Sequence, residues 1–209
     1  MKKTSTSIIK TIFGLDNAFV RICALIYDLF LVNVIFILTC LPVFTIGMAK
    51  RSLYVTLVKR RQSAQLAVVR TYLQEFKSKK GFILGLIELF LIAVCFLDIV
   101  LLLGQEMLVA QLIKVLSFSI LFLVAMTFLM VYPLETRVEL PIKETLKRSF
   151  LLAGIHLPVT LITMTVLLGI LFILFYSGFT LLIGLSLLSL GGYAGLVYVH
   201  LYLIEKRIT

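Results

Sequence analysis

Three acidic residues, Asp28, Glu88 and Asp98, stand inside long apolar runs of the sequence. A carboxylate at the centre of a bilayer is costly, so such acids usually face protein or water, pair with a base, and mark ion or proton pathways. Glu88 lies about two helical turns inside its run and is the costliest of the three. We therefore predict an intramembrane polar site made of these acids, Asn33 and two candidate counter-charges, Arg51 and Arg137.

The same residues also have a plainer interpretation. Asp28 stands within two turns of the start of its apolar run, where a side chain can reach the lipid headgroups. Glu88 could reach the interface in the same way. The sequence leaves open whether these acids form a site or only extend toward water.

Other chemistry has few residues to support it. His156 and His200 are far apart, and the sequence contains no HExxH, GxSxG or P-loop pattern. The cysteines Cys23, Cys40 and Cys95 lie in apolar runs without CxxC spacing, so neither a disulfide framework nor a zinc site is indicated. We expect no catalytic residues, no metal, no cofactor and no enzyme activity.

The elements that position these residues are membrane helices. Of 209 residues, 61% are hydrophobic and only 14% are charged, and the mean hydropathy is +1.14. Soluble domains are about half apolar and about a quarter charged. The chain is therefore predicted to be a single, all-α, polytopic membrane domain over residues 1–209. Five runs are long enough to cross a bilayer: 22–46, 82–103, 115–134, 157–176 and 181–204.

Basic residues predict the orientation of these spans. Most of them fall in the loops 47–81 and 135–156 and at the C-terminus, which places those segments in the cytoplasm by the positive-inside rule. The net charge of +10 then indicates contact with anionic lipid headgroups rather than nucleic acid, for which no motif is present. We expect a multi-pass protein of the bacterial cell membrane.

Apolar stripes predict two amphipathic cytoplasmic helices within these loops. The first carries Leu66, Val69, Leu73 and Phe76, and the second carries Ile142, Leu146, Phe150 and Ala153. A further surface helix is predicted near the N-terminus, around residues 8–13.

The segment after Pro42 has two interpretations. Pro42 interrupts the first apolar run, and Gly47 follows closely. Residues 47–80 form a basic surface loop in one interpretation. In the other, residues 42–58 form a short re-entrant or sixth helix. The second interpretation would place the basic N-terminal segment on the cytoplasmic side as well.

Two sequence elements resemble a known family. The first contains Pro42, Thr45 and Gly47, and the second contains Tyr132, Pro133, Leu134 and Arg137. Together with the EFKSKKGFILGLIELF stretch they resemble the YesL-like family of bacterial integral membrane proteins, also called domain of unknown function 624. That resemblance implies an all-helical bacterial membrane protein, often encoded near carbohydrate-uptake systems, with no agreed activity.

Two functional hypotheses follow. The protein is either an accessory or regulatory component that contacts a carbohydrate transporter subunit or anionic lipid, or a small transporter or channel-like protein that uses the intramembrane acids. Acids that converge between helices would favour the second hypothesis.

Overall fold

The fold is described from a computed structural model that covers residues 18–63 and 66–208. The predicted N-terminal surface helix lies outside this part. Throughout the described part the secondary structure is helical, without a strand, which confirms the all-α prediction. The helices are α2 (Ala18–Cys40), η1 (Val43–Thr45), α3 (Ile46–Gln62), α4 (Val68–Glu75), α5 (Lys79–Leu101), α6 (Leu108–Glu135), α7 (Ile142–Ile155), α8 (Leu157–Tyr176), α9 (Gly178–Leu187), η2 (Leu188–Gly192) and α10 (Tyr193–Ile208).

Five helical segments in the described residues are long and apolar enough to cross a bilayer, as in a multi-pass membrane protein. They are Val20–Cys40, Lys79–Leu101, Leu108–Glu135, Leu157–Tyr176 and Gly178–Ile204. This confirms the predicted number of long spans. Most side chains of these segments are not buried within the protein, so their apolar faces must be covered by lipid or by another protein.

Several helix ends differ from the predicted ones. The first span ends at Cys40 instead of residue 46, because the chain bends at Leu41 and Pro42. The third begins at Leu108 instead of residue 115 and continues through Pro133 to Glu135. A proline this close to the end of a helix removes only one backbone hydrogen bond and need not stop it.

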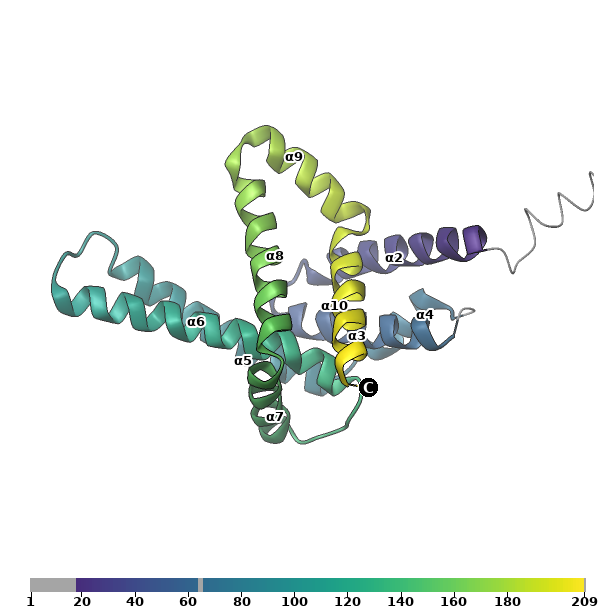
Figure 1. Cartoon of the computed structure of the whole chain (residues 1–209), viewed down its shortest axis with the longest axis horizontal. Helices are drawn as coiled ribbons and strands as arrows, with labels where there is room; N and C mark the ends of the chain where they lie inside the picture. The colour runs from purple at the N-terminus through teal and green to yellow at the C-terminus, as the bar shows by residue number, and fades with distance from the viewer. Residues whose placement is uncertain (1–17, 64–65, 209) are drawn as a thin grey trace, which may run out of the picture.

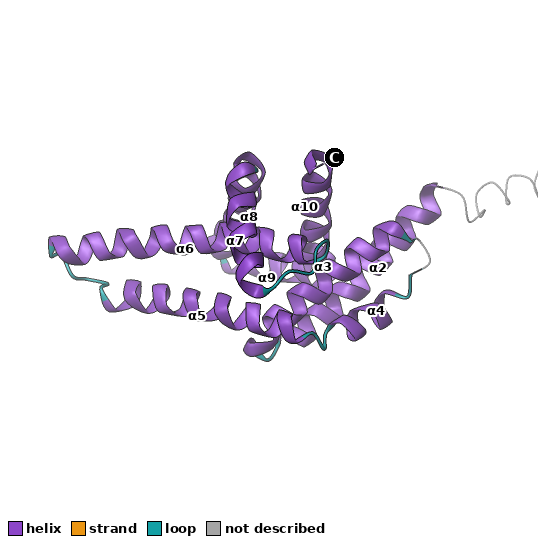
Figure 2. Ribbon diagram, turned by 90° about the horizontal axis from the view of Figure 1, so that it is seen from below, coloured by secondary structure: helices purple, strands orange, loops and turns teal. Residues whose placement is uncertain are grey.

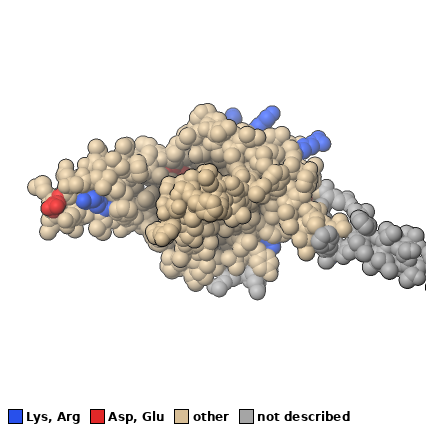
Figure 3. Space-filling view, turned by 90° about the horizontal axis from the view of Figure 1, so that it is seen from above, with Lys and Arg blue, Asp and Glu red and all other residues tan. Residues whose placement is uncertain are grey.

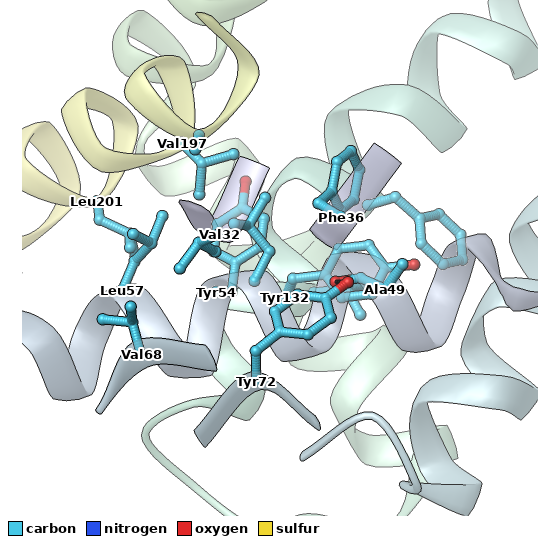
Figure 4. Packing of buried hydrophobic residues seen from close by; sticks show 14 of the residues in the cluster. Val32, Phe36, Ala49, Tyr54, Leu57, Val68, Tyr72, Tyr132, Val197 and Leu201 are labelled. Atoms are coloured by element: carbon cyan, nitrogen blue, oxygen red, sulfur yellow. Dashed lines mark hydrogen bonds between the residues drawn. The ribbon is translucent and has the colours of Figure 1, made fainter. Parts of the chain in front are cut away.

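The helix after Pro42 forms the centre of the molecule. Nine residues of α3 are buried, and the helix contacts α2, α4, α5, α6 and α10. Figure 4 shows Tyr54 and Leu57 of α3 packed among Val32, Tyr132 and Val197 from three other helices. Of the two interpretations, the structure therefore has the packed helix, although it does not fix where the membrane lies around it.

Long helices radiate from this centre instead of forming one parallel bundle. The α5–α6 hairpin leaves in one direction and α2 in the opposite one, while α8 and α10 cross both (Figure 1). The same divergence of α5–α6 from α8 is visible in the second view (Figure 2). We call the region where these arms meet around α3 the hub.

The two predicted amphipathic helices, α4 and α7, both lie at the hub. α4 buries Val68 and Tyr72, whereas Val69 and Leu73 of the predicted apolar stripe are exposed. α7 buries Thr145, Ser149 and Ala153. The small side chains of α7 allow close packing on α6.

A glycine contact joins α3 to α5. A Cβ atom on Gly47 would collide with the backbone of Gly85 and would lie 2.5 Å from the carbonyl oxygen of Gly81. The two helices therefore cross at a distance that no larger residue allows at this point. The crossing brings the charged residues after Gly47 against the apolar face of α5.

Candidate functional site

A charged contact lies one turn beyond the glycine crossing. Lys50 Nζ is 2.5 Å from Glu88 Oε1, and the Tyr132 hydroxyl donates to Glu88 Oε2 over 2.7 Å. The three side chains come from α3, α5 and α6 and adjoin a cavity of about 180 Å³. One carboxylate thus holds three helices together.

The electrostatics of this contact favour the charged pair. Burial by itself lowers the pKa of Lys50, but the charge of Glu88, the neighbouring Tyr193 and Cys40 and the hydrogen bond to Glu88 together outweigh burial, and the pKa is raised. The ammonium group also lies 5.7 Å from the centroid of the Tyr132 ring, within range of a cation–π attraction. Lys50 is therefore a stable cation at neutral pH.

Aromatic side chains line the same cavity as the pair. The rings of Tyr54 and Tyr132 stack with centroids 5.9 Å apart. The Tyr54 hydroxyl lies 3.4 Å from Nδ1 of His200, whose Nε2 is buried without a partner. These groups can hold and orient polar side chains.

A second pair joins α2 to α3. Arg60 Nε donates to Asp28 Oδ2 over 2.5 Å, and both side chains are largely buried. Asp28 also lines a broad apolar groove of about 800 Å³ between α2 and α4. Asp28 and Glu88 therefore adjoin different cavities.

Arg51 belongs to a third charged group. Its Nη1 is 3.0 Å from Glu75 Oε2, and Lys59 Nζ is 2.8 Å from the other oxygen of Glu75. Partial burial raises the pKa of Glu75, but its hydrogen bonds to Lys59 and Arg51 more than offset this, so its pKa is lowered. The buried Glu135 is more loosely held, at 3.7 Å from Arg51 and 3.8 Å from Lys80.

Asn33 acts on the backbone at a helix break. Near Gly191, which has φ +118°, the last long apolar segment changes from α9 through the π-helical turn η2 to α10. The Asn33 amide donates to the carbonyls of Leu188 and Ser189 at 2.7 and 3.0 Å and accepts from the Ala194 N–H at 3.0 Å. The fully buried side chain satisfies backbone groups that the break would otherwise leave unpaired.

The remaining predicted residues lie apart from these pairs. Asp98 accepts a 3.4 Å hydrogen bond from Ser117 near the far end of α5. It is about 15 Å along the helix from Glu88. Arg137 is exposed after the end of α6. The structure thus brings neither Arg137 nor Arg51 to Asp28, Glu88 or Asp98.

The predicted structural motif residues surround the start of α3. The hydroxyl of Thr45 lies 2.5 Å from the Thr39 carbonyl and 2.6 Å from the Pro42 carbonyl, which ties the bend together. Gly47 makes the glycine crossing described above. Tyr132 and Pro133 are buried in α6, where Tyr132 reaches Glu88.

Sequence reasoning missed the bases that pair with the acids. The predicted polar site includes neither Lys50 nor Arg60, which lie in the segment interpreted either as a basic loop or, up to residue 58, as a short helix. A signal was present, because Lys50 stands among apolar and small residues within a segment that could be helical. A lone basic residue among apolar residues of a helix predicts that a buried acid pairs with it.

One family comparison matches a segment within the first half of the chain. Residues 29–99 match the family described as "Protein of unknown function, DUF624". The DUF624 match begins in α2 and ends in α5, and it includes the glycine crossing and the Lys50–Glu88 pair. This confirms the family resemblance predicted from the sequence over these residues. No curated protein and no solved structure is significantly similar to the chain.

The described residues include no group of side chains suited to a metal ion. Across residues 18–63 and 66–208, no three His, Cys, Asp or Glu side chains lie close enough together to hold a metal ion. The arrangement can instead neutralise charge inside an apolar protein and fix helices to each other.

Proposed function

We propose that this protein is a non-catalytic accessory or regulatory membrane component associated with carbohydrate uptake. One observation carries the proposal. Two of the predicted intramembrane acids, Asp28 and Glu88, are each bound by a base of α3 and adjoin separate cavities. Ion pairs that join helices favour a structural, scaffold-like role. A transport pathway instead needs polar side chains that line one common cavity.

The exposed arms supply the surface such a scaffold needs. At the α8–α9 tip, Phe172, Phe175, Tyr176 and Phe179 are each more than 70% exposed. Figure 3 shows a face almost free of charge at its centre, with Lys and Arg mainly along the upper edge and a further basic and an acidic residue on the arm at the left. An apolar surface of this kind suits lipid or the transmembrane helices of a transporter subunit.

The partner class comes from the family resemblance, which implies proximity to carbohydrate-uptake systems. The test is purification of the tagged full chain from its own membranes in mild detergent. We expect a sugar permease subunit in a fixed ratio and reduced sugar uptake in a deletion strain. The variant Phe175→Ser, at the exposed tip, should weaken the association, and Phe118→Ser on the α6 arm serves as the matched control. A chain that purifies alone, together with unchanged uptake in the deletion strain, would refute the proposal.

A small transporter is the second candidate, and one observation favours it. The Glu88 carboxylate adjoins a cavity of about 180 Å³ together with Lys50 and Tyr132, which is room for several waters. Under this hypothesis Glu88→Gln abolishes solute-coupled proton flux in reconstituted vesicles but leaves the fold intact, because glutamine cannot exchange a proton. Absence of flux in vesicles of the unaltered protein excludes this candidate.

A further inference from the structure

The broad groove between α2 and α4 is large enough to hold a ligand. It measures about 800 Å³, within the range of about 300 to 1,000 Å³ that is usual for small-molecule sites. α4 packs beside α2 (Figure 1), and the walls between them are mainly apolar, with Leu31 on α2 and Val69 and Leu73 on α4. The accessory role proposed above makes no use of this groove.

The wall that α4 supplies is amphipathic. Val69 and Leu73 are four residues apart, and so are Arg70 and Gln74, so an apolar pair and a polar pair lie side by side along the helix. Lys77 follows shortly after the end of α4 and lines the same groove. Val69 is 37% exposed and Leu73 is 50% exposed. An exposed apolar strip beside polar and basic groups fits a ligand that is itself amphipathic.

The charges along the groove favour an anionic ligand. Arg70 and Lys77 are exposed side chains of the lining. Asp28 also belongs to the lining, but Arg60 already binds its carboxylate. Long basic side chains can lay their apolar stems along an apolar surface while their charged ends stay in water. The two cations can therefore meet the polar end of a ligand whose apolar part fills the groove.

The position of the groove on α2 favours a lipid over a soluble anion. α2 contains the segment Val20–Cys40, which is long and apolar enough to cross a bilayer, so lipid chains cover its exposed sides. A soluble phosphate would leave the apolar walls of the groove uncovered. We propose that the groove binds one molecule of an anionic phospholipid, with an acyl chain along Leu31 and Leu73 and the headgroup phosphate at Arg70 and Lys77.

The experiment adds phosphatidylglycerol to the delipidated full chain in a nonionic detergent. Lipid that binds the folded protein raises its melting temperature, so a concentration series gives the affinity. The double variant Arg70→Gln/Lys77→Gln should bind about 25-fold more weakly, because each basic residue near an anionic lipid contributes a factor of about five. Phosphatidylcholine with the same acyl chains has no net charge, so it should bind about as weakly and be indifferent to the double variant. Leu73→Asn should weaken the binding of both lipids, because it places an amide against the acyl chain.

Arg148→Gln on α7 and Leu116→Asn on α6 are the matched controls, since both residues are exposed and lie outside the groove. Both should bind phosphatidylglycerol like the unaltered protein, and all variants should melt normally without lipid.

Equal binding of the two lipids, or equal losses in the variants and their controls, would show unspecific lipid contact and overturn the proposal. Equal stabilisation by glycerol 3-phosphate would overturn it in favour of a soluble phosphate. Absence of any lipid effect would also overturn it, and a dimer that Leu73→Asn separates would then assign the groove to a second copy of the chain.

Discussion

Lys50 and Glu88 show how a charged helix becomes the centre of an apolar protein. Each charge alone would be costly to bury, but together with the Tyr132 hydroxyl they satisfy each other across three helices. The pair contributes less to net stability than its short distance suggests, because both ions lose water. Removal of only one partner should therefore lower the stability more than removal of both, because it leaves one buried charge unpaired.

Glu88→Leu should destabilise the protein by about 3 kcal/mol, because it leaves the Lys50 ammonium buried without its partner. The double variant Lys50→Met/Glu88→Leu should recover much of the loss, because neither charge then remains. Thermal unfolding in detergent measures both effects. The matched control is Glu106→Leu, in the exposed turn before α6, with no expected loss. A double variant as unstable as Glu88→Leu contradicts this account of the pair.

Glu75 predicts a dependence of stability on pH. Its pKa is lowered in the folded protein by Lys59 and Arg51, so its contribution is complete above the unfolded pKa of about 4.3. The contribution disappears as the pH falls through the lower folded value. The stability difference between the unaltered protein and Glu75→Gln should therefore shrink from pH 6 toward pH 3. A stability difference between the two proteins that grows as the pH falls would contradict this prediction.

At the residue scale the sequence predicted the acids better than their partners. Asp28 and Glu88 stood out because each carboxylate interrupts an apolar run. Their bases lie 32 and 38 residues away in sequence, and only the packing of α3 brings them close. Arg51 and Arg137 were equally plausible on charge alone.

The crossing of α3 and α5 at Gly47 sets the distance between these two helices of the hub. A methyl group on residue 47 has no space against the backbone of α5, so the helices must separate and the Lys50–Glu88 distance must grow. Gly47→Ala should therefore lower the melting temperature and also reduce the effect of Glu88→Leu, since the two sites are coupled. Calorimetry on the two single variants and the double variant checks this.

Gly154→Ala provides the matched control for the crossing. Gly154 also lies in a helix, α7, but a Cβ atom there meets no other atom within 4 Å. Alanine should be neutral there or stabilise the helix by about 0.5 to 1 kcal/mol. Equal destabilisation by the two alanines would show that helix propensity, and not close packing, explains the loss at Gly47.

At the element scale, length and hydropathy were enough to predict the five spans. They were not enough for α3, because its composition is that of a basic surface loop and its burial depends on acids in other helices. The break at Gly191 was also missed, since two adjacent glycines fit a closely packed straight helix as well as a kink.

The whole molecule carries its apolar surface on divergent arms. Helices that cross a bilayer lie within about 40° of its normal, whereas α8 crosses the α5–α6 hairpin (Figure 1). We therefore expect the arms to become more nearly parallel in a membrane. Spin labels at Glu106 and Gly178, the two hairpin tips, should be closer in nanodiscs than in the structure.

Labelling from one side of the membrane tests the accompanying topology. In a background without Cys23, Cys40 and Cys95, cysteines at residues 106 and 178 should react from the outer face. A cysteine at residue 143 in α7 should react only from the inner face. Reaction of residue 143 from outside contradicts the orientation predicted from the basic loops.

The contact between Asn33 and the helix break also sets an order of events during synthesis. Asn33 is made 155 residues before Leu188, an interval of about 8 to 30 s at ordinary elongation rates. Until Leu188, Ser189 and Ala194 are synthesised, the side-chain amide of Asn33 lacks its final hydrogen-bond partners. Asn33→Leu should therefore lengthen the lifetime of a chain truncated after Ser177 while it shortens that of the full chain. Pulse-chase half-lives measure both, and a shorter lifetime in both chains would show that Asn33 finds another partner early.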